Sequence, residues 1–253
     1  MNILQVDSIS HLYFTEQSVV KALENVSLTV KNGEFISFLG PSGCGKTTLL
    51  SIIAGLLQPT KGNIWHNEDG SNHSVGYMLQ HDYLFPWKTI EENILLGLKI
   101  NKKNNTENRN YALSLLEEMG LKGTRQQFPR QLSGGMRQRA ALVRTLAVSP
   151  QLLLLDEPFS SLDYQTKLKL ENLIVLTLKQ LNKSAILVTH DIGEAIAMSN
   201  RILLFSPRPG RLFKEWTVPS SLQTLTPLET RNEKEYRELF QIIWKEMEQF
   251  ERK

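Results

Sequence analysis

One stretch of this chain, FISFLGPSGCGKTTLL from Phe35 to Leu50, restricts the possible folds more than any other. An apolar run, a glycine-rich turn and a helix-forming segment follow one another in it, and the turn has the pattern G-x-x-x-x-G-K-[ST]. Because glycine carries no Cβ, backbone N–H groups in such a turn can converge on phosphate oxygens, and the positive end of the next helix points to the same place. We therefore expect a strand from Phe35 to Leu39, a phosphate loop from Gly40 to Gly45 and a helix from Lys46 to Leu57.

The phosphate loop would place two side chains on a bound nucleotide. Lys46 would meet the β- and γ-phosphates, and the hydroxyl of Thr47 would coordinate Mg²⁺. The alternative is a glycine-rich turn with an incidental lysine. The strand before the turn and the helix after it favour the nucleotide site.

The composition is that of a soluble globular protein without a strongly charged tail. Of the 253 residues, 41% are hydrophobic and 22% are charged, and Lys and Arg outnumber Asp and Glu by only 29 to 26. No basic run marks a nucleic-acid-binding tail, so nothing here supports a nucleic-acid partner. The single cysteine, Cys44, lies in the phosphate loop and cannot form an internal disulfide, which fits a reducing cytosol. A small loop-filling side chain is a better interpretation of it than a redox group.

The sequence shows no segment that targets or spans a membrane. The first residues, MNILQVDSIS, lack the basic start and the apolar stretch of a signal peptide. No apolar run approaches the roughly 20 residues that are needed to span a bilayer. We expect that this chain does not enter a membrane by itself.

Strands alternate with helices over most of the chain. Two alternating segments, Leu4–Tyr13 and Ala22–Lys31, predict an antiparallel edge sheet. Three continuous apolar runs, Gln151–Leu155, Ser184–Thr189 and Arg201–Phe205, predict parallel strands that are buried on both faces. A ligand is then expected at the carboxyl ends of these strands.

The remaining segments predict short strands and helices. Short strands are expected at Asn63–His66 and Val75–Leu79, after a turn marked by Pro59 and Gly62. Helical periodicity runs from Thr89 to Gly120 with an exposed connection at Asn101–Asn110, begins again after Ser133, and returns in a charged amphipathic segment at Glu233–Arg252.

Two acids end the apolar run of residues 151–155. Beside the phosphate loop, Asp156 could hold hydrated Mg²⁺, and Glu157 could align and deprotonate an attacking water, as in-line phosphoryl transfer requires. The alternative is a solvated strand end, and the phosphate loop upstream favours the catalytic interpretation.

A second glycine-rich turn, LSGGM at Leu132–Met136, opens a helix and offers N–H groups and a hydroxyl to an anion. The stretch LSGGMRQR resembles the signature motif of the ATP-binding cassette family. It is followed by a strand that resembles the family's Walker B motif, LLLLDEP, by a D-loop, SSLD at Ser160–Asp163, and by a switch histidine, His190, in VTHD. The motifs lie in the family's order, and the resemblance covers Leu4 to about Gly210.

The resemblance implies a fold and a division of the chain. The expected fold is α/β, a P-loop NTPase with a RecA-like core and parallel sheet, an N-terminal antiparallel edge sheet and an inserted helical subdomain. Residues 1–80 and 151–210 would form the catalytic core, about 81–150 the helical subdomain with the signature, and 211–253 a C-terminal helical tail.

The resemblance also implies the site residues. In this family two subunits dimerise head to tail, and each ATP lies between the phosphate loop of one and the signature of the other. Residues expected to bind ATP in the same chain are Gly40, Pro41, Ser42, Gly43, Cys44, Gly45, Lys46, Thr47 and Thr48. Residues expected to contact the γ-phosphate of the ATP held by the partner are Ser133, Gly134 and Gly135. Asp163 of the D-loop is also expected to bind nucleotide.

Catalytic and metal roles follow from the same resemblance. Gln80 matches the Q-loop glutamine, which contacts Mg²⁺ and the attacking water and couples to membrane subunits. Thr47, Gln80 and Asp156 would then serve the metal, and the catalytic residues would be Glu157, His190, Gln80 and Lys46. Tyr13 matches the aromatic residue that stacks on adenine, with Phe14 as the fallback; from the residues alone, a core aromatic is an equally good interpretation of this pair.

The stretch HDYLFPWKTIEENILLGL, directly after Gln80, indicates which group within the ATP-binding cassette family the chain resembles. With LLLLDEPFSSLD and SPRPGRL it resembles the nitrate, sulfonate and taurine importers, whose relatives also carry pyrimidine precursors of thiamine. The aromatic cluster Phe85–Trp87 would meet a partner's helix, or would be buried in the chain's own core. The implied partners are a second copy, two separate permease subunits and, indirectly, a solute-binding protein, which places the chain at the cytoplasmic face of the cell membrane.

Two other classes remain as alternatives. A soluble cassette ATPase that acts on nucleic acid or ribosomes would usually carry paired cassettes or long inserted coiled coils, and this chain has neither. A GTP-driven switch would need a guanine-reading N-K-x-D, which is absent. The sequence therefore favours an ATPase that energises an importer.

Overall fold

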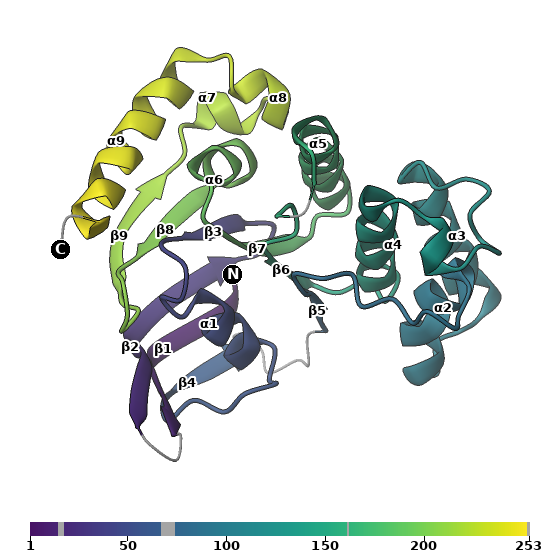
Figure 1. Ribbon diagram of the computed structural model, residues 1–253, viewed down its shortest axis with the longest axis horizontal. Helices are drawn as coiled ribbons and strands as arrows, with labels where there is room; N and C mark the ends of the chain where they lie inside the picture. The colour runs from purple at the N-terminus through teal and green to yellow at the C-terminus, as the bar shows by residue number, and fades with distance from the viewer. Residues whose placement is uncertain (15–17, 67–73, 161, 252–253) are drawn as a thin grey trace.

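The molecule contains two sheets with helices packed against them, and a separate group of helices to one side (Figure 1). The computed structural model describes residues 1–14, 18–66, 74–160 and 162–251. Helix α1 (Lys46–Ile53) lies between the sheets, and its Leu49 and Leu50 belong to the same buried cluster as Leu4 of the first sheet and Phe38 of the second. The phosphate loop, which precedes this helix, is thereby held between the two sheets.

The N-terminal sheet is antiparallel, in the order β2-β1-β4. In its central strand Leu4 and Val6 are buried while Gln5 and Asp7 are exposed, the alternation of a strand with one solvated face. The predicted edge sheet is confirmed, with longer strands than predicted. The bounds are β1 (Asn2–Phe14), β2 (Val19–Lys31) and β4 (Lys61–His66).

The second sheet has the order β5-β6-β7-β3-β8-β9. All neighbouring pairs are parallel except β8 and β9, which are antiparallel. Every residue of β3, β6 and β7 is buried, because other elements cover both faces of the sheet, and this explains the continuous apolar runs. The bounds are β3 (Phe35–Leu39), β5 (Val75–Met78), β6 (Leu152–Asp156), β7 (Ser184–Thr189), β8 (Arg201–Phe205) and β9 (Leu212–Thr217).

Helices α5 (Tyr164–Gln180) and α6 (Ile192–Met198) follow β6 and β7 and pack beside the second sheet (Figure 1). Ile174 and Leu178 of α5 share a buried cluster with Leu155 and Leu187 of the sheet. Beyond α6 lie α7 (Ser220–Gln223), α8 (Pro227–Thr230) and the long α9 (Lys234–Glu251), which packs on α6.

The helices α2 (Ile90–Ile100), α3 (Thr106–Glu118) and α4 (Gly134–Leu146), with the short helix η1 (Pro129–Gln131), form the group on the right of Figure 1. A capping box starts α2: the Thr89 hydroxyl accepts from the Glu92 backbone N–H, and the Glu92 carboxylate accepts from the Thr89 backbone N–H. The apolar faces of α2, α3 and α4 meet in one buried cluster. These helices therefore agree with the predicted helical subdomain, although the division of the chain stays a prediction.

Several predicted boundaries were wrong. The helix after the phosphate loop ends at Ile53 and not at Leu57, because Gly55 takes a left-handed φ of 72°. The predicted connection at Asn101–Asn110 is shorter, since the Asn105 side chain accepts from a backbone N–H and caps α3. The strand predicted at Val75–Leu79 ends at Met78.

The predicted turn at Gly62 lies inside strand β4. A Cβ on Gly62 would come 2.5 Å from the carbonyl oxygen of Asp7, so β4 approaches β1 closely at this residue. Gly62 therefore allows β4 to lie close to β1, and it does not end a strand.

The segment predicted as a helical tail, 211–253, begins with a strand. Strand β9 pairs with β8, for example Leu203 with Glu215, and extends the second sheet by one antiparallel edge. Helices follow only after it. None of the helices in the described parts of the chain is long and apolar enough to cross a membrane.

Candidate nucleotide site

The phosphate loop connects the end of β3 to the start of α1. Gly40, Gly43 and Gly45 all have positive φ angles, of 151°, 74° and 105°. A Cβ on Gly45 would lie 2.7 Å from the carbonyl oxygen of Ala22 in β2, so the loop rests directly on the N-terminal sheet. Cys44 is buried, in agreement with a loop-filling side chain.

Lys46 places its charge inside this loop. Its side chain is only 4% exposed, and its ammonium group donates to the carbonyl oxygens of Gly40 at 2.7 Å and Pro41 at 2.9 Å. The ammonium group therefore lies against the glycine-rich turn, where a lysine can meet phosphate oxygens.

Thr47 and Asp156 meet as the sequence predicted. The Thr47 hydroxyl donates to Asp156 Oδ1 at 3.0 Å. Burial raises the pKa of the Asp156 carboxyl above its ordinary value, while the hydrogen bonds from Thr47 and Tyr77 oppose that rise. A hydroxyl and a carboxylate are the oxygen ligands that Mg²⁺ prefers, so the two residues fit the predicted ion; when bound, it would offset the charge of the phosphates.

Tyr77 was not predicted as part of the site. Its hydroxyl donates to the other carboxylate oxygen of Asp156 at 3.3 Å. Burial, and next the negative charge of Asp156, raise the pKa of Tyr77 to about 12, so its proton stays available to that carboxylate. Tyr77 pairs with Leu154 in the parallel register of β5 and β6, and this pairing brings it near Asp156. No motif in the sequence indicated that contact.

Glu157 lies between two other predicted residues. Gln80 Nε2 donates to Glu157 Oε2 at 3.3 Å, and His190 Nδ1 lies 3.5 Å from Glu157 Oε1. The three residues follow the neighbouring parallel strands β5, β6 and β7, so the sheet brings them to one edge. Glu157 itself has a φ of 45°, uncommon for a residue other than glycine, and its backbone N–H donates to the Val188 carbonyl.

Tyr13 borders the same site. Its hydroxyl is 3.2 Å from the Thr48 hydroxyl, and its ring, 41% exposed, packs edge-on against His11. A cavity of about 170 Å³ lies here. Its lining consists of Tyr13, Ala22, residues 42–48, Glu157 and Arg208. Phe14 does not line this cavity, so the arrangement favours Tyr13 over Phe14 for adenine, a role that stays a prediction.

Ser133, Gly134 and Gly135 do not line this cavity. They begin α4 in the helical group, where the Ser133 hydroxyl accepts from the Met136 N–H at 3.3 Å and caps the helix. A Cβ added to Gly135 would come 2.8 Å from Thr166 Cγ2, whereas one on Gly134 would meet no described atom within 4 Å. The structure thus separates the signature from the phosphate loop of the same chain.

Asp163 starts helix α5. Its exposed carboxylate accepts from the Thr166 backbone N–H at 3.0 Å, and hydrogen bonding to Thr166 holds the pKa of the carboxyl below its ordinary value. Ser161, also in the predicted D-loop, lies outside the described residues. Asp163 does not line the cavity at the phosphate loop.

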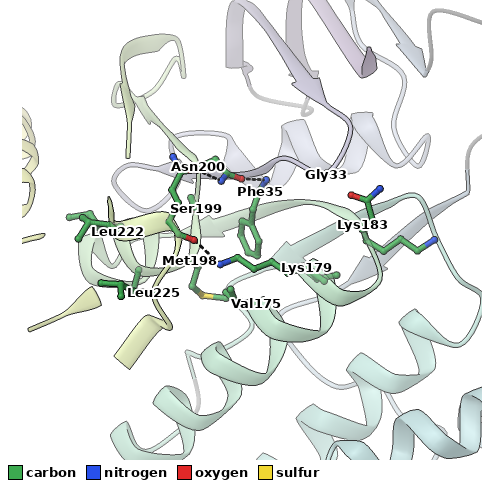
Figure 2. Close-up of a pocket in the computed structure, with 15 residues that line it drawn as sticks. Gly33, Phe35, Val175, Lys179, Lys183, Met198, Ser199, Asn200, Leu222 and Leu225 are labelled. Carbon is green, nitrogen blue, oxygen red and sulfur yellow. Dashed lines mark hydrogen bonds between the residues drawn. The ribbon is translucent and has the colours of Figure 1, made fainter. Parts of the chain in front are cut away.

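A second cavity, of about 180 Å³, lies at the opposite end of the sheet (Figure 2). Phe35 at the start of β3 and Asn200 just before β8 line it, whereas the phosphate loop follows the end of β3. Some of its polar groups already form hydrogen bonds within the protein: Lys179 donates to the Gln223 carbonyl, and Asn200 accepts from the Phe35 N–H. This cavity contains none of the predicted site residues.

Comparison with known proteins identifies the family. The family model for the ABC transporter matches residues 23–160. An uncharacterized ABC transporter ATP-binding protein of Bacillus subtilis, YtlC, is 54% identical over 100% of this chain and 98% of its own length. The taurine import ATP-binding protein TauB of Ruegeria pomeroyi is 40% identical, over 87% of this chain and 83% of its own length. The nitrate import ATP-binding protein NrtD of Synechocystis is 38% identical, over 85% of this chain and 82% of its own length.

Solved structures agree with this. A dimeric structure of a post-hydrolysis state of the ATP-binding cassette MJ0796 with ADP and Pi is 31% identical, with a TM-score of 0.75, and the match covers 86% of this chain and 99% of that one. The predicted α/β cassette fold is confirmed. The chain therefore belongs to the ABC transporter family, as an ATP-binding cassette that hydrolyses ATP.

Proposed function

We propose that this chain is the ATPase subunit of an importer for a small solute. Two copies would form a head-to-tail dimer at the cytoplasmic face of the cell membrane, bound to two permease subunits that receive solute from a binding protein. Similarity to the taurine and nitrate import proteins supports this function. The proposed solute is an anion such as a sulfonate or nitrate, or a pyrimidine precursor.

The position of Glu157 between Gln80 and His190 carries the catalytic part of the proposal. Its carboxylate is placed to take a proton from water as the water attacks the γ-phosphorus atom of ATP and ADP leaves. His190 and Gln80 would orient the carboxylate and the water. Lys46 would bind the phosphates, and Thr47 and Asp156 would hold Mg²⁺ beside them.

The separation of the signature from the phosphate loop supports the dimer. Ser133, Gly134 and Gly135 lie too far from their own cavity to line it, yet they present a capped helix N-terminus that can bind an anion. A second copy would bring these groups, and Asp163, to the γ-phosphate. The dimeric MJ0796 cassette is a similar structure with this assembly state.

An aromatic loop held by hydrogen bonds supports the proposed contact with permease. Trp87 is 70% exposed and lies 5.4 Å from the ring of Phe85, so the alternative prediction of core burial does not hold for Trp87. The buried Asn93 holds this loop: it accepts from the Phe85 N–H and donates to the carbonyls of Lys88 and Thr89. An exposed aromatic residue on a fixed loop is suited to a partner's apolar helix.

Replacement of the proposed base tests this function. We expect Glu157→Gln to lower the rate of phosphate release at least about 100-fold, because the amide cannot accept the proton of water. We also expect the variant to accumulate as a dimer in saturating MgATP, since ATP that is not hydrolysed would hold the two copies together. Light scattering after gel filtration measures the dimer, and a phosphate-release assay measures the rate.

The exposed Glu238 on α9 provides the matched control. Glu238→Gln makes the same chemical change away from the cavity and should keep the wild-type rate. A Glu157→Gln variant that hydrolyses ATP normally would overturn the role of Glu157, and one that stays monomeric in saturating MgATP would overturn the proposed sandwich.

A further inference from the structure

The connection between β8 and β9, residues 206–211 with the sequence SPRPGR, lies against the phosphate loop. Gly210 makes this approach possible: a Cβ at this residue would be only 2.0 Å from the carbonyl oxygen of Cys44. Any side chain here would push the two loops apart. The β8–β9 connection therefore forms one wall beside the predicted nucleotide cavity.

Backbone hydrogen bonds hold this wall in place. The Gly210 N–H donates to the Ala22 carbonyl and the Glu24 N–H donates to the Gly210 carbonyl, both at 2.9 Å, so the connection is joined to β2. Ser206 closes the connection on itself, because its hydroxyl accepts from the Arg211 N–H and lies 3.1 Å from the Pro209 carbonyl. The connection is thus closed on itself and joined at Gly210 to β2, the strand on which the phosphate loop rests.

Arg208 projects from this wall into the site. Its Nε donates to the carbonyl of Gly43 in the phosphate loop at 3.2 Å, and the side chain lines the cavity with Tyr13 and Lys46. The guanidinium group has five N–H donors in a planar fork, and among the described residues the bond to Gly43 is its one hydrogen bond. Its outer donors can therefore reach a ligand while Nε holds the loop.

Arg211, on the same connection, serves a different contact. Its guanidinium group forms an ion pair with Glu24 of β2 and does not line the cavity. The two arginines thus have the same charge and nearly the same place in the sequence, but only Arg208 faces the predicted nucleotide.

We propose that Arg208 is a nucleotide-binding residue, which anchors Gly43 and donates to the phosphates of ATP as a second cation beside Lys46. This rests on the proposed nucleotide site at the phosphate loop. Guanidinium is suited to this role, since its planar fork matches two phosphate oxygens at once. The β8–β9 connection then adds to ATP binding a residue from outside the phosphate loop.

Nucleotide titration of matched variants tests this inference. We expect Arg208→Gln to weaken the binding of MgATP about tenfold, the usual effect of losing one charge-assisted hydrogen bond. Arg211→Gln removes the same charge from the same connection and should bind MgATP like the wild type. Arg208→Lys keeps the positive charge but lacks the planar fork, so its affinity for MgATP should lie between those of Arg208→Gln and the wild type. Isothermal titration calorimetry measures each affinity.

The melting temperature without nucleotide separates binding from support of the fold. Arg208→Gln should melt like the wild type, because its side chain is exposed. The inference would be overturned if Arg208→Gln bound MgATP with wild-type affinity, or if Arg211→Gln lost as much affinity as Arg208→Gln. It would also be overturned if the loss of affinity in Arg208→Gln came with a lower melting temperature. If Lys46→Ala also bound MgATP normally, the nucleotide site itself would be wrong; if Lys46→Ala alone lost binding, only the role of Arg208 would fail.

Discussion

At the scale of single residues, the charged groups that line the cavity already have partners within the protein. Lys46 donates to two carbonyl oxygens of its own loop, and the Glu157 carboxylate contacts the side chains of Gln80 and His190. Such prior positioning means that little side-chain ordering remains to be done when nucleotide binds.

Removal of the Lys46 ammonium group should therefore reduce nucleotide affinity strongly. We expect Lys46→Ala to bind a fluorescent ATP analogue at least about tenfold more weakly, because each charge-assisted hydrogen bond to phosphate contributes about 1.5–3 kcal/mol. Lys61→Ala, at an exposed lysine of β4, is the control and should bind normally. Unchanged affinity in Lys46→Ala would refute the phosphate-loop assignment.

The residues that sequence motifs predicted and those that they missed differ in a physical way. Lys46, Thr47, Asp156 and Glu157 stand at fixed places in short motifs, so local pattern was sufficient to select them as candidates, and the fold then brings Thr47 to Asp156. Tyr77 reaches Asp156 only through strand register. No pattern within one segment contains that information.

At the scale of elements, ion pairs join the helices that follow the site. Lys167 of α5 lies 2.6 Å from the carboxylates of both Asp191 and Glu194, at the start of α6 directly after His190. Further along α5, Glu171 is fully buried and lies 2.7 Å from a guanidinium nitrogen of Arg231, next to α8. The ion pair between Arg231 and Glu171 thus joins the C-terminal helices to α5, and Lys167 joins α5 to the segment that follows His190.

Glu171 should make stability depend on pH. Burial raises the pKa of its carboxyl to about 7, against the opposing effect of Arg231. Since this folded-state pKa lies above the unfolded value, the folded protein binds more protons between about pH 4.5 and 7, and the unfolding free energy falls as pH rises through that range. Glu171→Gln should remove this dependence.

Urea unfolding at pH 5 and pH 8 measures the effect. Relative to the wild type, Glu171→Gln should gain on the order of 2–3 kcal/mol in unfolding free energy between these pH values. The control Glu238→Gln replaces an exposed carboxyl, so its unfolding free energy should differ from that of the wild type by the same amount at pH 5 and at pH 8. A constant difference between Glu171→Gln and the wild type would show that the buried carboxyl is ionised throughout.

Element types were more predictable than their ends. The parallel strands were evident because burial on both faces leaves continuous apolar runs. Strand β9 was missed, since its sequence LFKEWT is exposed or half-buried along its length and carries no such run. Its pairing with β8, a contact across the chain, determines its structure.

At the scale of the whole molecule, the proposed permease contact and the nucleotide site are linked through one segment. Gln80, beside Glu157, lies only a few residues before the aromatic loop, and that loop is fixed to α4 by Arg144, which donates to the carbonyls of Asp82 and Tyr83. Movement of the helical group would therefore carry the exposed Trp87 with it.

Trp87→Ala should separate transport from nucleotide binding. We expect the variant to bind MgATP like the wild type and to lose co-purification with its permease, because truncation of a central aromatic residue commonly costs an interface about 2 kcal/mol or more. Trp244→Ala, at a tryptophan of α9 that is 52% exposed, is the control and should still co-purify. Normal co-purification of Trp87→Ala would refute the proposed contact.

Gly134, the first residue of α4, is a position at which a mutational scan can separate the needs of folding from those of assembly. A methyl group added there meets no described atom within 4 Å, and helix propensity favours alanine over glycine. Folding of a single chain thus gives no reason to exclude alanine. Intolerance of alanine at this position in a mutational scan would therefore report selection on an encounter with another molecule, and natural variation at one small residue could reveal an assembly that a lone chain does not display.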